Sequence, residues 1–72
     1  MELCIKLTWD SETCVWIAES PDVPGLILES GSFDALIERL RLTIPEMLQL
    51  NGGLKTPLYL NFISERHEQV AI

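Results

Sequence analysis

Hydrophobic and polar residues alternate with a period of two over residues 3–9, which is typical of a strand with one buried face. Residues 10–13 are polar and turn-prone, and residues 14–19 are rich in β-branched and aromatic side chains. We therefore expect an antiparallel hairpin with Ser11 and Glu12 at the centre of its turn. In this register Trp9 faces Cys14, and the next pairs along the ladder are Leu7 with Trp16 and Ile5 with Ala18.

The predicted register gathers most apolar side chains on one face of the hairpin. This core face holds Leu3, Ile5, Leu7, Trp9, Cys14, Trp16 and Ala18. The opposite face is mixed and contains Cys4, so the two cysteines point to opposite sides and cannot form a disulfide.

The alternation stops at residues 20–25, where Pro21 and Pro24 lack the backbone donor of a strand and Gly25 permits a positive φ. A rigid turn is expected there, followed by a short third strand at residues 26–30. The short connection favours an antiparallel return, and hence a three-stranded meander.

A helical pattern begins after Ser32, which is a good N-cap residue. Its apolar stripe at i, i+3, i+4 and i+7 consists of Phe33, Leu36, Ile37, Leu40, Ile44, Met47 and Leu48. Pro45 interrupts the helix, and Thr43 to Glu46 also matches a capping box, so the helix either kinks or restarts. The stripe stays in phase across Pro45, which favours a kink, and residues 51–53 form a glycine stop.

Residues 58–63 predict a fourth strand, and a helix between the third and fourth strands is a crossover connection. The expected fold class is α+β, with a two-layer β-β-β-α-β order, one helix kinked near Pro45 on a four-stranded sheet, and a single domain over residues 1–72. Residues 64–72 fit a short strand, a tail or an interface arm.

Composition limits the kinds of partner and the cellular compartment that we expect for this protein. The 72 residues carry five Lys and Arg against eleven Asp and Glu, a net charge of −6, which argues against direct nucleic-acid binding and suits a basic partner. No apolar run is long enough to cross a membrane, and residues 1–4 lack the basic and apolar regions of a secretory leader, so we expect no membrane association. Two cysteines are too few for a disulfide scaffold, and a cytoplasmic protein is expected.

No catalytic motif is found, and we expect no enzyme, no cofactor and no metal. The acidic residues at turns and strand ends are interpreted as solvated loop residues: Asp10, Glu12, Glu19, Asp22 and Glu29. A metal-dependent hydrolase that uses Asp10, Asp22 or Glu29 is the less favoured interpretation. His67, the single histidine, lies among charged residues and is expected to be solvated.

The predicted fourth strand is uncharged and strongly β-prone, so at a sheet edge it needs cover or a partner. The candidate interface consists of Tyr59, Asn61, Ile63, Val15 and Ile17. Exposed apolar area of this kind favours association, and a homodimer is expected. The alternative is that residues 70–72 fold back over this strand.

Several segments together resemble a small bacterial family of unknown function that is grouped with the HicB-like antitoxins. These segments are Trp9-Asp10, residues 15–20, residues 22–26, residues 45–48 and Asn51-Gly52. The acidic-x-Pro-Gly turn of that family is matched by Asp22, Pro24 and Gly25. The resemblance implies a reduced ribonuclease-H-like fold, with strand order 3-2-1-4 and a fourth strand parallel to the first.

The resemblance also implies a function. HicB antitoxins neutralise HicA, a small basic RNA-cleaving toxin, and such a partner suits the acidic charge. The metal-binding acids of ribonuclease H have no counterpart, because the fourth strand offers Asn61 alone. A separate DNA-binding segment is not expected before residue 3 or after Ile72. A small-ligand-binding or regulatory domain, using the turn at Pro21 to Gly25 and the sheet edge, is the alternative.

Overall fold

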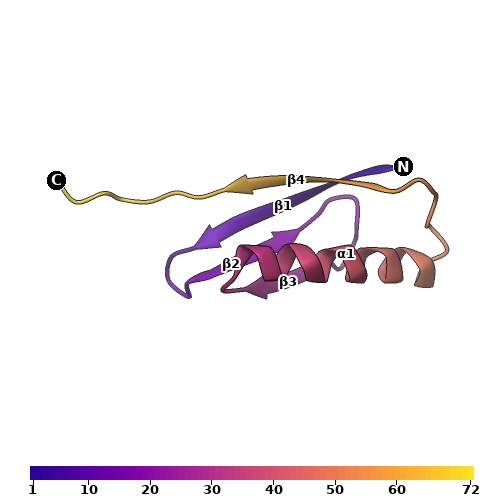
Figure 1. Cartoon of the computed structure of the whole chain (residues 1–72), viewed down its shortest axis with the longest axis horizontal. Helices are drawn as coiled ribbons and strands as arrows, with labels where there is room; N and C mark the ends of the chain where they lie inside the picture. Colours follow the sequence, from indigo (N-terminus) through magenta and orange to yellow (C-terminus); the bar gives the residue numbers. More distant parts are fainter.

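A computed structural model describes the whole chain, residues 1–72, as one helix on one face of a four-stranded sheet (Figure 1). The elements in chain order are β1 (Glu2–Asp10), β2 (Val15–Glu19), β3 (Ile27–Ser30), α1 (Phe33–Leu50) and β4 (Tyr59–Glu65). The sheet order is β3-β2-β1-β4, with β4 parallel to β1 and the other neighbours antiparallel. The predicted α+β class and the strand order implied by the resemblance are both confirmed.

The hairpin register differs from the prediction by two residues. Trp9 pairs with Trp16 and Leu7 with Ala18, because the connection is a four-residue turn over residues 11–14. The Asp10 carboxylate stabilises this longer turn, accepting hydrogen bonds from the Thr13 hydroxyl at 2.9 Å and the Glu12 amide at 3.0 Å. A shift of two keeps the strand side chains on their predicted faces, since side chains alternate with a period of two.

Cys14 is the residue that the register error misplaces. It lies in the turn with a positive φ of 56° and is exposed, whereas the prediction placed it on the core face. Cys4 is half-buried in β1, and both cysteines are free thiols.

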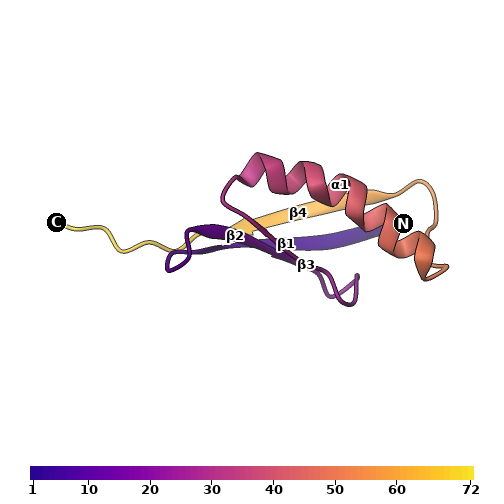
Figure 2. The same cartoon turned by 90° about the horizontal axis from the view of Figure 1, so that it is seen from below.

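The helix has well-defined ends. The Ser32 hydroxyl caps its start by accepting from the Ala35 amide at 3.2 Å. At the other end the Gly53 amide donates to the Leu48 carbonyl and the Gly52 amide to the Gln49 carbonyl, with Gly52 at φ 68°, which is a Schellman motif. The helix is unbroken through Pro45, and Figure 2 shows its axis bending along its length.

The core lies between α1 and the sheet. Its buried side chains come from alternate positions of β1, from Ala18 of β2, from the helix stripe and from the loop before β3: Leu3, Ile5, Leu7, Ala18, Val23, Leu26, Leu36, Leu40, Ile44 and Leu48. The other face of the sheet, referred to below as the outer face, has no layer packed on it (Figure 2).

Residues 66–72 continue from the end of β4 and project away from the domain without regular secondary structure (Figures 1 and 2). This projection makes the molecule elongated, with extents of 50 × 19 × 17 Å. Residues 70–72 therefore do not fold back over β4, and Val70 and Ile72 are exposed.

Candidate functional site

The turn that carries Asp22, Pro24 and Gly25 has a clear structural role. The Leu26 amide donates to the Val23 carbonyl at 3.1 Å, and Gly25 takes φ 83° after Pro24, which together define a type II turn. Val23 and Leu26 on either side of it are buried in the core. The Pro-Gly pair thus forms a turn tight enough for the side chains on both sides of it, Val23 and Leu26, to reach the core.

Asp22 satisfies the backbone of the central strand. Its carboxylate accepts a hydrogen bond from the Cys4 amide at 2.8 Å, and the Ser20 hydroxyl donates to the Cys4 carbonyl. Cys4 lies beyond the last pair of the β1–β2 ladder, Lys6 with Glu19. Beyond the end of β2, side chains of the turn therefore satisfy the backbone amide and carbonyl of β1.

The five residues predicted as an interface all lie on the outer face. Tyr59, Asn61 and Ile63 alternate along β4, while Val15 and Ile17 lie on β2. Tyr59 is 62% exposed and Ile63 48%, whereas the two β2 residues are half-buried. The β1 strand, with Lys6 and Thr8, separates the two groups, so the structure brings them onto one face but not into one continuous apolar patch.

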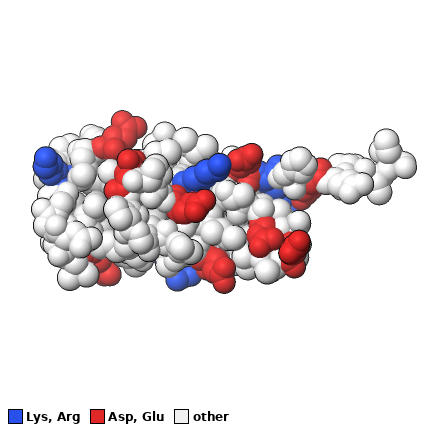
Figure 3. Space-filling view, turned by 180° about the vertical axis from the view of Figure 1, so that it is seen from behind, with Lys and Arg blue, Asp and Glu red and all other residues white.

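Acidic side chains dominate the charged groups of this outer face. The register of the four strands places on it Glu2, Asp10, Glu19, Glu29 and Glu65, with Lys6 as its one basic residue. Lys6 is paired with Glu65 at 3.3 Å. Figure 3, viewed from behind, shows red side chains scattered among larger uncharged areas.

The edge of β4 that points away from β1 has no neighbouring strand. On the helix side of β4 the side chains of Leu58, Leu60 and Phe62 are only half-buried, because α1 lies over β2 and β3. Together with Arg41 and Pro45 of the helix they line a groove of about 470 Å³.

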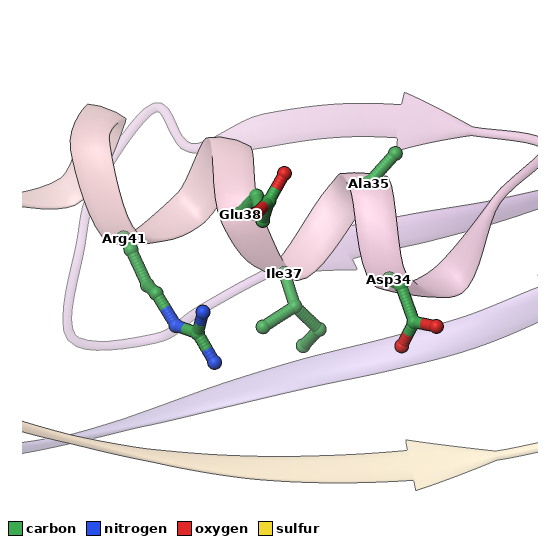
Figure 4. A pocket seen from close by; sticks show the side chains of 5 residues that line it. All are labelled: Asp34, Ala35, Ile37, Glu38 and Arg41. Atoms are coloured by element: carbon green, nitrogen blue, oxygen red, sulfur yellow. The ribbon is translucent and has the colours of Figure 1, made fainter.

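The helix flank above this groove is partly charged. Figure 4 shows Asp34, Ile37 and Arg41 pointing from α1 toward the side where β1 and β4 lie, around a second hollow of about 420 Å³. The space between α1 and β4, which we name the α1–β4 groove, thus has an apolar floor and a mixed polar rim.

An aromatic cluster at the far end of the sheet escaped the sequence analysis. The Trp9 and Trp16 rings lie 5.5 Å apart, and Phe33 meets Trp16 edge-on at 5.0 Å. The Arg66 guanidinium lies 4.2 Å from the centre of the Trp9 ring, a cation–π contact, and pairs with Glu68 at 2.6 Å. Arg66 lies an even number of positions after Leu60 and Phe62. This spacing is the sequence signal that could have placed Arg66 on the helix side of the sheet.

Of the acidic residues considered for metal chemistry, Asp10 and Asp22 hold turns, while Glu29 lies in β3 on the outer face. Hydrogen bonds from Thr13 and then from Glu12 hold the pKa of the Asp10 carboxyl below its ordinary value of 3.8. Asp22 bonds the β1 backbone, and no group of three or more His, Cys, Asp or Glu side chains is arranged to hold a metal ion. His67 is exposed in the projecting segment.

The hollow nearest to the turn at Pro21 to Gly25 is small and polar. It measures about 290 Å³ and is lined by Lys6, Glu19, Ser20 and Pro21. The single helix is not long and apolar enough to span a bilayer.

The comparisons with known proteins agree with this fold. A hypothetical protein from the extremely thermophilic bacterium Thermus thermophilus, TTHA1013, has a crystal structure that matches with a TM-score of 0.84. It shares 37% sequence identity, and the match covers 97% of this chain and 100% of that one. A search of curated proteins gives no match. The model of a domain of unknown function, DUF1902, matches residues 2–72, and the chain belongs to this family.

Proposed function

We propose that this domain is a non-catalytic protein-interaction module of the cytoplasm that neutralises a small basic RNA-cleaving toxin, as the HicB antitoxins do. The observation that carries the proposal is the uncovered outer face, which carries five carboxylates and one lysine together with exposed Tyr59 and Ile63. An antiparallel or mixed sheet with one uncovered face is common, but apolar side chains on it favour a partner.

The charge of the outer face supports a basic partner. Its net charge from Asp, Glu and Lys is −4, five acids against Lys6, out of −6 for the chain. Such a field speeds the approach of a cationic protein and selects against acidic ones and against nucleic acids. Because these carboxylates are exposed, the association is expected to weaken as salt is added.

The hydrogen bonding of the acids supports a role without catalysis. Asp10 and Asp22 are engaged with the backbone and side chains of their own turns and of β1. Small-ligand binding at the turn has less support, because the Asp22 and Ser20 side chains already bond Cys4 and the adjoining hollow is small. Two free cysteines suit a reducing compartment.

A second part of the proposal is that the domain acts as a homodimer. The free edge of β4 is seven residues long and uncharged from Tyr59 to Ser64, which is the kind of edge that pairs with another strand. The edge and the outer face are different surfaces, so a second copy and a toxin can bind together.

The test is to look for a short basic protein encoded next to this gene and to purify it. Calorimetry should show binding to the full chain, with loss of RNA cleavage by the toxin at equimolar ratio. The double variant Tyr59→Ser/Ile63→Ser should weaken binding about 100-fold, since two apolar contacts are lost without a change in charge. Leu42→Ser, which removes an exposed apolar side chain from the helix instead, is the control and should bind normally. The lack of a basic neighbour that binds, or binding that ignores the double variant, overturns the proposal.

A further inference from the structure

The segment of residues 66–72 is exposed throughout, although it carries apolar Val70 and Ile72, and Arg66 lies over Trp9 of the domain. We propose that it is an exchanged arm, which extends β4 and pairs antiparallel with the β4 edge of a second copy. This inference rests on the proposed homodimer and names the segment that builds it.

The chain cannot easily cover this edge by itself. A return of the segment along its own β4 requires a tight hairpin, and such turns use Gly, Asn, Asp or Pro. Residues 65–72 contain none of these residue types. The segment accordingly continues outward in the direction of β4, where only another molecule can meet it (Figure 1).

The strand alternation persists into the segment. Arg66 follows Leu60 and Phe62 at even positions, and its guanidinium lies over Trp9 on the helix side of the sheet. Extended backbone with this phase puts Val70 and Ile72 on the same side. The two apolar residues of the arm thus match the helix side of the sheet, and Gln69 lies on the outer side.

Symmetry determines which side chains meet across the pair. Two identical antiparallel strands are related by a two-fold axis perpendicular to the sheet, so residues of even number face residues of even number. Val70 and Ile72 of one copy must then point to the side of Leu58, Leu60 and Phe62 of the other. That side is the open α1–β4 groove, whose apolar floor lacks cover in the single chain.

Charge disfavours two registers of the pair. An axis at Glu65 or at Arg66 would place a like charge directly opposite itself, which destabilises a sheet pair. An axis at Ser64 avoids both like-charge pairs and is the one that sets Val70 opposite Leu58, with His67 opposite Asn61. Arg66 and Glu68 balance each other, so the arm adds no net charge to an acidic surface.

Sedimentation equilibrium of the purified full chain tests the arm without any toxin. The wild type should have twice the monomer mass of 8.2 kDa. Val70→Asp/Ile72→Asp should raise the dimer dissociation constant at least about 100-fold, because two apolar side chains lose their burial. The helical part of its far-ultraviolet spectrum should stay unchanged, since neither side chain is buried in the single chain. Leu42→Asp, equally exposed and on the helix, should remain dimeric.

Cross-linking locates the axis. Ser64→Cys in a Cys4→Ala/Cys14→Ser background should form a covalent dimer in oxidised glutathione, whereas Gln49→Cys in that background should not. A wild-type monomer at all concentrations, or a dimer that Val70→Asp/Ile72→Asp leaves intact, overturns the arm even if a toxin binds the outer face. A dimer that is broken by these substitutions but is not cross-linked at residue 64 overturns the axis at Ser64.

Discussion

The carboxylate of Asp22 accepts the backbone amide of Cys4 at 2.8 Å, eighteen residues away along the chain. Through this bond a side chain continues the ladder of β1 where β2 has ended. The acidic residue of the Asp-x-Pro-Gly turn is thus a structural partner of the central strand, and its removal should lower the free energy of unfolding.

Asp22→Ala should lower the free energy of unfolding by about 1–2 kcal/mol, because the Cys4 amide loses its acceptor. Asp22→Asn keeps an acceptor oxygen at the same place and should lose less. Urea denaturation followed by tryptophan fluorescence measures both. Equal stability of Asp22→Ala and the wild type would contradict the role assigned to this bond.

Gly25→Ala should destabilise the domain by about 1 kcal/mol, because φ 83° is unfavourable for a residue with a Cβ. No atom lies within 4 Å of the added methyl group, so the cost is conformational and not steric. Gly31→Ala is the matched control: its backbone is ordinary, its Cβ meets only the Cys14 carbonyl at 3.7 Å, and its stability should stay near that of the wild type. Thermal unfolding of the two variants measures the difference.

The turn at Asp10 should depend on pH in a defined direction. Since folding lowers the pKa of this carboxyl below 3.8, its stabilising contribution is complete above the unfolded value and is lost as the pH falls through the folded value. Asp10→Asn should therefore reduce stability near neutral pH and make little difference once the pH lies below the folded value. Urea denaturation of both proteins across this pH range measures the effect.

The cause of this pKa shift can be checked separately by following the Asp10 carboxyl in an NMR titration. Thr13→Val removes the largest contribution, the hydroxyl hydrogen bond, and should raise the pKa toward 3.8. An unchanged pKa in Thr13→Val would show that the hydroxyl is not the main cause.

Arg66→Ala should lower stability by about 0.5–1 kcal/mol and change the tryptophan emission, because the cation over Trp9 is removed. Arg66→Lys should retain part of the effect. Glu68→Gln is the control for the ion pair: both groups are about half-exposed, so its loss should cost little. Thermal unfolding and emission spectra of the three variants, all at one concentration, measure these effects.

Much of the fold follows from periodicity. The Ser32 cap, the apolar stripe and the glycine stop locate α1, and the alternation in residues 3–9 locates β1 and its buried face. The hairpin register could not be obtained in this way, since a shift of two residues leaves the faces unchanged. The register depends on the hydrogen bonds by which the Asp10 carboxylate holds a four-residue turn, and the alternation of hydrophobic and polar residues does not reveal such bonds.

The candidate surface was predicted in part. Tyr59, Asn61, Ile63, Val15 and Ile17 share the outer face because strand parity alone decides this. Alternation could not show that β1 separates the β4 residues from the β2 residues. The order of the strands was predicted only from the family resemblance and not from the residue pattern. The contact of Arg66 with Trp9 depends on the parallel placement of β4 beside β1, which brings together residues far apart in the chain.

The parallel pairing of β1 with β4 joins the first strand of the chain to the last. Glu2 can pair with Tyr59 only after residues 33–59, including the helix, have been synthesised. During synthesis β1 therefore leaves the ribosome early, and its edge toward β4 has no partner until then. The meander and α1 can assemble first through nearer contacts. Pairing β4 with β1 closes the longest loop of the sheet, so we expect it to be the slow step of folding.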